Sequence, residues 1–114
     1  MSMHCLGTLG VARKELLTGG YACLDVVTHI VSDCGATCMG GQVHEFVGDG
    51  FTLLVALAES HVSIHTWPER MTVQLDVFLC SYLRDNAARS ERIFRRISDY
   101  FEPTERHETL IQRV

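Results

Sequence analysis

The chain has 114 residues, a length typical of one domain that can bury a hydrophobic core of its own. Hydrophobic residues make up 46% of it and charged residues 21%, a balance that excludes an intrinsically disordered chain. The net charge of −4 argues against a nucleic-acid-binding protein, which needs a basic face for phosphates, so we expect no nucleic-acid partner.

The N-terminal part of the chain shows a strand pattern followed by a helix pattern. Residues 4–12 are glycine-rich and lightly apolar and predict a strand. From Tyr21 to Cys34 the apolar residues recur at helical spacing, and Gly35 favours a helix end directly afterwards.

The middle of the chain predicts strands and turns. Residues 36–46 predict a strand with a bulge or bend at Gly40-Gly41. Residues 47–50 (VGDG) are typical of a turn, and the apolar run 51–58 is typical of a buried central strand.

Two further strands follow, joined by a turn that contains a proline. Residues 61–67 predict the first strand, and the sequence PER at 68–70 predicts the turn. Residues 71–80 alternate in polarity, which is typical of a half-buried antiparallel strand. One face carries Met71, Val73, Leu75, Val77 and Leu79, and the other carries Thr72, Gln74, Asp76, Phe78 and Cys80.

The C-terminal part predicts one helix and a short strand. Asp85 or Asn86 is suited to cap a helix that runs to about Tyr100. Its inner face would carry Ile93, Phe94, Ile97 and Phe101. Residues 108–114 predict the final strand. Together the elements predict a single α+β domain over residues 1–114, with two helices packed on one mostly antiparallel sheet.

The cysteines and the N-terminus predict the compartment. Five cysteines, an odd number, are typical of reduced thiols in the cytoplasm. The start MSMHCLGTLG lacks the features of a signal peptide, and no window approaches the roughly 20 apolar residues of a membrane span. We therefore expect a cytoplasmic protein with no membrane partner. Cys34 and Cys38 could begin a zinc site, but no second pair has matching spacing, so buried small side chains are the favoured interpretation and no metal is expected.

The segment 57–69, LAESHVSIHTWPE, places titratable side chains inside strand-forming sequence. A hairpin that turns at the sequence PE would put residue 77 or 78 opposite Ser60, and the register stays open. In one register Phe78 and Cys80 lie on the same face as Ser60. A thiol and a hydroxyl would then meet at the end of a strand pair.

Strand geometry constrains the two histidines of this segment. His65 lies five residues beyond Ser60, about 16 Å along a strand and on the opposite face, so a contact between them requires a bend or bulge. His61 and His65 have the spacing of a metal-binding pair on a helix. Because the segment is a strand, shared metal ligation is not expected.

The string AESHVSIHTWPE followed by LDVFLC resembles the prokaryotic S-adenosylmethionine decarboxylases, a family of small pyruvoyl enzymes. The match is nearly gapless over residues 58–80 and extends more weakly into GATCMGGQVHEF and HCLGTLGVARKELL upstream. The resemblance implies a self-cleaving carboxy-lyase that converts S-adenosylmethionine to its decarboxylated form for spermidine synthesis.

The resemblance implies that the chain breaks its own peptide bond between Glu59 and Ser60, giving chains 1–59 and 60–114. Ser60 attacks the preceding carbonyl, and His65 removes the Ser60 α-proton, with Thr52 in the place of a serine that assists processing. Ser60 becomes a pyruvoyl group, which forms a Schiff base with the substrate amine.

The resemblance also implies the remaining site residues. Cys80 matches a proton donor, Phe46 an aromatic that stacks on adenine, and Glu69 a carboxylate that binds the ribose hydroxyls. Trp67 belongs to the same substrate-binding set. Two protomers are expected to pack sheet against sheet as a four-layer αββα homodimer with two active sites near the interface.

Several positions depart from the family pattern. Thr52 replaces a serine but keeps a hydroxyl, so self-cleavage is expected. Thr8, Leu9 and Gly10 stand where the family has acidic and aromatic residues, and Ser81 replaces a glycine. These changes bear on substrate recognition. They leave two alternatives: a pyruvoyl enzyme acting on arginine or ornithine, or an unprocessed, non-catalytic homologue that could bind metal through the two histidines and a cysteine.

Overall fold

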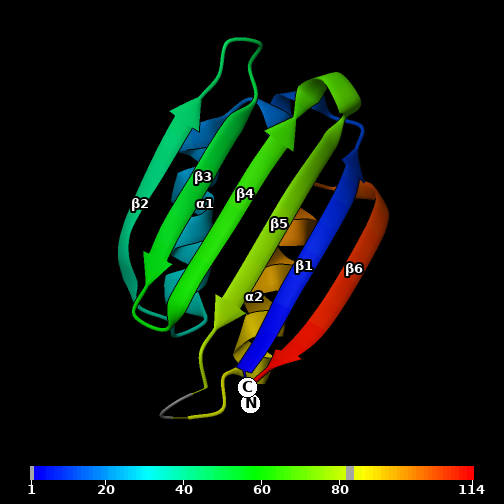
Figure 1. Cartoon of the computed structure of the whole chain (residues 1–114). Helices are drawn as coiled ribbons and strands as arrows, with labels where there is room; N and C mark the ends of the chain where they lie inside the picture. The colour runs from blue at the N-terminus through cyan, green and yellow to red at the C-terminus, as the bar shows by residue number, and fades with distance from the viewer. Residues whose placement is uncertain (1, 82–83) are drawn as a thin grey trace.

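The computed structural model describes residues 2–81 and 84–114 as one sheet with two helices on a single face (Figure 1). The sheet order is β2-β3-β4-β5-β1-β6, with neighbouring strands antiparallel, which confirms the α+β prediction. In this part of the chain no helix is long and apolar enough to cross a membrane. The strands are β1 (Ser2–Val11), β2 (Cys38–Glu45), β3 (Phe51–Leu57), β4 (Ser60–Trp67), β5 (Thr72–Leu79) and β6 (Pro103–Arg113), and the helices are α1 (Gly20–Asp33) and α2 (Ala87–Tyr100).

The core lies between the two helices and the inner face of the sheet. Burying one leucine-sized side chain contributes about 1.5–3 kcal/mol, so this layer is the main source of stability. The predicted inner face of α2 is confirmed, since its four apolar side chains are all buried. On β5 the buried positions are those that the alternation predicts, namely Val73, Leu75, Val77 and Leu79.

Two strands differ from their predictions. β3 is buried on one face alone, because the helices cover one side of the sheet and Leu54 on the other side is 48% exposed. β6 begins at Pro103 rather than near residue 108. Residues 104–107 (TERH) are polar and carry no apolar alternation, so their pairing with β1 leaves no signal in the sequence. Charges on such an edge strand also oppose pairing with other chains.

The connections on either side of β3 and β4 set the register of the sheet. The predicted irregularity at Gly40 is present, since the pairing of β2 with β3 shifts between Cys38 and Gly40. The β4–β5 connection contains the 3-10 helix η2 (Pro68–Arg70) and Met71, which has a left-handed φ of 49°. This connection is longer than the predicted registers require. Leu79 therefore lies opposite Ser60, and the prediction of residue 77 or 78 was wrong.

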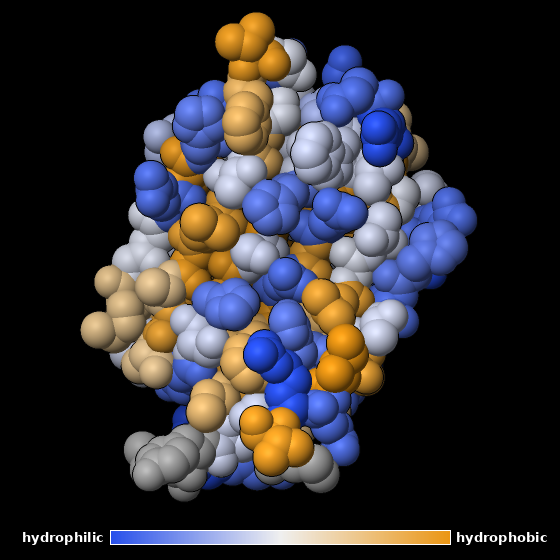
Figure 2. All heavy atoms as spheres, viewed as in Figure 1, coloured by the Kyte–Doolittle hydropathy of each residue, from blue (hydrophilic) through white to orange (hydrophobic). Residues whose placement is uncertain are grey.

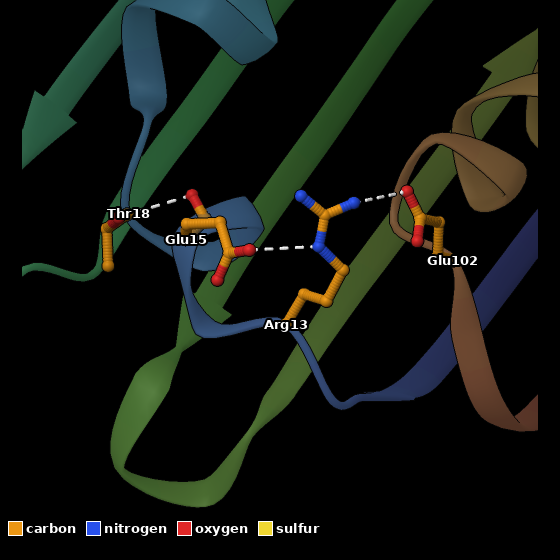
Figure 3. A network of polar contacts seen from close by, with 4 residues as sticks. All are labelled: Arg13, Glu15, Thr18 and Glu102. Carbon is orange, nitrogen blue, oxygen red and sulfur yellow. Dashed lines mark hydrogen bonds and ion pairs between the residues drawn. The ribbon is translucent and has the colours of Figure 1, made fainter.

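An exposed polar network joins the segment after β1 to the turn before β6 (Figure 3). The Nε of Arg13 lies 2.9 Å from Glu15 Oε1, and its Nη1 lies 2.8 Å from Glu102 Oε2. The Thr18 hydroxyl donates to the Glu15 carbonyl oxygen. Water screens exposed ion pairs, so the network adds little stability to the fold.

Cysteines occur both in the core and at the surface. Burial raises the pKa of Cys5 to about 11 and that of Cys23 to about 12, so both thiols stay protonated and unreactive. Cys34 is also buried, as predicted. Cys38 is exposed, contrary to the prediction, because it begins the edge strand β2. Cys80 is the other exposed thiol in the described part of the chain.

Candidate active site

The sheet face opposite the helices is uncovered. Figure 2 shows hydrophilic and hydrophobic residues interspersed across it. A shallow depression of about 640 Å³ lies on this face, lined by residues of β1, β4, β5 and β6 that include Thr8, Ser63, His65 and Asp76. The candidate site residues occupy two places around this depression.

Ser60 begins β4 with an unusual backbone conformation. Its φ of 157° lies in a region that residues other than glycine rarely adopt. Its Oγ lies 3.1 Å from His61 Nδ1. The carbonyl oxygen of the preceding Glu59 accepts a 2.8 Å hydrogen bond from the backbone N–H of Cys80. The backbone is therefore strained at the N–Cα bond that follows the Glu59–Ser60 peptide bond, and the carbonyl of that peptide bond is polarised.

The backbone of Cys80 is held at both of its polar groups. Its N–H donates to Glu59, and its carbonyl oxygen accepts a 2.9 Å hydrogen bond from the side-chain amide of the buried Asn86. The Asn86 side chain does not cap α2, whereas the Asp85 carboxylate accepts a hydrogen bond from the N–H of Ala87. The contact of Asn86 with Cys80 was not predicted from the sequence, because an asparagine before a helix is also typical of a cap.

The other predicted site residues lie at the opposite end of the strands, where β2 and β4 finish (Figure 1). Thr52 Oγ1 lies 3.0 Å from His65 Nδ1 across the β3–β4 pair. Trp67 ends β4 and is 43% exposed, and Glu69 follows it in η2. Phe46, just after β2, is 52% exposed. A hydroxyl–imidazole pair and two partly exposed aromatics thus share this end of the sheet.

The two groups do not meet within one chain. β3 and β4 pair without a register shift from Ser60 to His65. Five strand positions separate these two residues, which corresponds to about 16 Å at roughly 3.3 Å per residue. The bend that a direct contact would need is not present. We call Glu59, Ser60 and Cys80 the cleavage end, and Phe46, Thr52, His65, Trp67 and Glu69 the His65 end.

Asp76 lies between these two ends, on the face of β5 that points away from the helices. It accepts a 3.3 Å hydrogen bond from the Ser63 hydroxyl, and its Oδ1 lies 3.5 Å from His4 Nε2. The alternation of β5 predicted the face of Asp76, but nothing in the sequence pointed to His4.

His61 and His65 are four positions apart, about 13 Å along the strand, which is too far to bind one metal ion. Among residues 2–81 and 84–114, no group of three or more His, Cys, Asp or Glu side chains is placed to hold a metal ion.

A family model and the two relatives described here share one name. A family model described as S-adenosylmethionine decarboxylase matches residues 3–114. The S-adenosylmethionine decarboxylase proenzyme of Archaeoglobus fulgidus is 33% identical over 100 residues, which cover 88% of this chain and 86% of that protein. The protein of the same name from Methanococcus maripaludis strain C5 is 48% identical over 80 residues, which cover 70% of this chain and 66% of that protein.

A solved structure has the same fold. The crystal structure of the adenosylmethionine decarboxylase from Aquifex aeolicus matches with a TM-score of 0.84 and 23% identity. The match covers 99% of this chain and 90% of that one. The arrangement of two helices on one sheet is therefore shared over nearly the whole chain.

Proposed function

The chain belongs to the S-adenosylmethionine decarboxylase family, and we propose on this premise that it is a self-cleaving carboxy-lyase acting on S-adenosylmethionine. The proposed cut lies between Glu59 and Ser60 and gives chains 1–59 and 60–114. Ser60 becomes a pyruvoyl group at the new N-terminus. The products of catalysis are carbon dioxide and decarboxylated S-adenosylmethionine. The observation that carries the proposal is the geometry of the Glu59–Ser60 peptide bond.

This peptide bond has three features that favour self-cleavage. The φ of 157° at Ser60 stores strain on the order of 1–3 kcal/mol, which breaking the bond releases. The Ser60 hydroxyl is adjacent to the carbonyl carbon that it attacks. The Cys80 N–H, 2.8 Å from the Glu59 carbonyl oxygen, is positioned to stabilise the negative charge that develops there.

The surroundings of Ser60 fit a pyruvoyl precursor. Residue 60 pairs with Leu57 of β3 and Leu79 of β5, so a new chain end at this position has strands on both sides to hold it. A pyruvoyl group supplies a carbonyl that takes up the substrate amine and accepts the electrons released when carbon dioxide leaves. The exposed thiol of Cys80 is the group of this chain that we assign to return a proton to the substrate carbon.

The distance between the cleavage end and the His65 end within one chain supports a homodimer as the active form. A second copy would cover the open face sheet against sheet, giving the four-layer αββα arrangement. If the two-fold axis lies between the sheets and perpendicular to the strands, the partner's strands run in the reverse direction. The His65 end of each protomer then lies over the cleavage end of the other. Each of the two sites combines residues from both chains.

We therefore expect His65 to act on Ser60 of the partner subunit. Ser60→Ala and His65→Ala proenzymes should each yield no fragments when made alone. When they are co-expressed, up to about half of the His65→Ala chains should be cut, because each heterodimer contains one complete site. Denaturing mass spectrometry measures this fraction. An isolated heterodimer that yields no fragments would show that His65 acts within its own chain.

The residues of the His65 end support S-adenosylmethionine as the substrate. An adenosine with an attached sulfonium needs aromatic faces for the base and the cation, and a carboxylate for the ribose hydroxyls. Phe46 and Trp67 are both partly exposed, and Glu69 lies directly after β4. In the proposed dimer all three lie across the interface from the cleavage end.

Glu69→Gln is expected to raise the KM for S-adenosylmethionine roughly tenfold or more, since a hydrogen bond to a charged group is worth about 1.5–3 kcal/mol. Self-cleavage should proceed normally, because the proposed cut uses the Ser60 hydroxyl and histidine bases and assigns no proton transfer to Glu69. Glu15→Gln, on the helix side of the molecule, is the matched control and should leave the KM unchanged.

The measurement is the release of labelled carbon dioxide from S-adenosylmethionine, arginine and ornithine, tested side by side on the native chain and both variants. Arginine and ornithine have no ribose, so Glu69→Gln should not change their turnover. A preference of the native chain for a free basic amino acid would overturn the assigned substrate. The altered positions Thr8, Leu9 and Gly10 would then be the first place to look for the cause.

A further inference from the structure

His61 makes a contact that the roles of Ser60, His65 and Cys80 leave unexplained. Its Nδ1 lies 3.1 Å from Ser60 Oγ, the atom that attacks the Glu59 carbonyl in the proposed cleavage. His65 instead contacts Thr52 at the other end of the strands. In the tautomer that carries its proton on Nε2, the His61 Nδ1 accepts a hydrogen bond from the Ser60 hydroxyl.

Neighbouring strands hold the His61 ring next to Ser60. Phe78 lies directly opposite His61 on β5, and His4 lies opposite Phe78 on β1. The ring centroids of His61 and Phe78 are 6.0 Å apart, and those of His61 and His4 are 6.2 Å apart in an edge-to-face arrangement. The position of the imidazole is therefore fixed by packing as well as by its contact with Ser60.

We propose that His61 is the general base for the first step of self-cleavage, a role that rests on the function proposed above. The Nδ1 takes the hydroxyl proton as Ser60 Oγ forms a bond to the Glu59 carbonyl carbon. The Cys80 N–H stabilises the charge on the carbonyl oxygen. The C–N bond then breaks, and His61 gives the proton to the departing Ser60 nitrogen. An amide becomes an ester and a free amine, and no further reactant is consumed.

Other titratable groups near Ser60 are less suited to this step. The Glu59 carboxylate accepts a 3.0 Å hydrogen bond from the N–H of Thr37, which directs it toward the loop before β2. Asp76 contacts Ser63 and His4. Arg113 of β6 lies over the Phe78 ring, with its Cζ 4.6 Å from the centroid, and carries a fixed positive charge.

The test isolates ester formation from the later steps. In a His65→Ala background, processing should stop at the ester, because the base for the Ser60 α-proton is missing. Saturating hydroxylamine cuts the ester as it forms and releases a fragment that begins with an unblocked Ser60. Adding His61→Asn keeps a polar group near Oγ but removes the base, and the rate of this cut should fall about 10²–10⁴-fold.

Two further variants exclude a merely structural effect. His29→Asn makes the same change on α1, behind the sheet, and should cut at the unchanged rate. His61→Ala should regain cutting when imidazole is added, in proportion to the neutral imidazole present. A rate within threefold of the His65→Ala parent in the His61→Asn variant, or no response of His61→Ala to imidazole, would overturn the role of His61. Failure of the native chain to cleave at all would overturn both this role and the proposed function.

Discussion

Ser60→Ala should leave a single uncleaved chain without decarboxylase activity. Alanine has no hydroxyl to attack the Glu59 carbonyl, so neither the ester nor the pyruvoyl group can form. The loss should be complete rather than partial, because one residue supplies both the nucleophile and the precursor of the cofactor. Denaturing mass spectrometry should show fragments 1–59 and 60–114 for the native chain, the second blocked to Edman sequencing, and one intact mass for the variant.

A matched serine in the same strand controls for effects of the substitution itself. Ser63 lies three positions further along β4 and donates a 3.3 Å hydrogen bond to Asp76. Ser63→Ala should therefore cleave at the native position. Fragments from Ser60→Ala would show that another residue is the nucleophile. A native chain that stays intact after long incubation would contradict self-cleavage altogether.

The fold could be predicted for those elements whose apolar side chains recur on the face that packs against the core. Because both helices lie on one side of the sheet, every inward position of β5 must be apolar, and the sequence shows this alternation. The same holds for the inner face of α2. The first part of β6 was not predictable. Its pairing with β1 is made by backbone groups, and polar side chains at an exposed edge leave no periodic signal.

The proposed site could be named from the sequence as a set of residues, but its arrangement could not. The string AESHVSIHTWPE predicts a nucleophile, a base and substrate-binding groups through its resemblance to the family, and strand spacing already separates Ser60 from His65. The contacts between strands depend on registers that connection lengths set. The conformation of residues 68–71 moves Leu79 opposite Ser60 and thereby lets the Cys80 N–H reach the Glu59 carbonyl. No pattern in the sequence predicts that shift of one or two residues.

Two residues gained importance only from the structure. Asn86 before a helix and a histidine next to a serine each have an ordinary interpretation, and neither stands out in the sequence. The Asn86 side chain donates a hydrogen bond to the carbonyl oxygen of Cys80, which lies outside its helix. The contact of His61 with Ser60 occurs where Ser60 has an unusual φ. In the proposed cleavage both bear on the same peptide bond, Asn86 through Cys80 and His61 through Ser60.

Cys80→Ala is expected to cleave itself normally yet turn over substrate about 10²–10⁴ times more slowly. The two functions separate because Cys80 contributes to cleavage through its backbone N–H, donated to the Glu59 carbonyl oxygen at 2.8 Å, which alanine retains. The thiol, in contrast, is the proposed source of the proton that returns to the substrate carbon. Fragment masses report the cleavage, and labelled carbon dioxide release under multiple turnover reports the catalysis.

Cys38→Ala is the matched control, because Cys38 is also exposed but lies at the start of the edge strand β2. Its turnover should equal that of the native chain. Unchanged turnover in fully cleaved Cys80→Ala would remove the thiol from catalysis, and a failure of this variant to cleave would show that the thiol itself assists the cut. Cys5 and Cys23 should not compensate. Burial holds their pKa values at about 11 and 12, and both lie in the core on the helix side of the sheet, away from the open face.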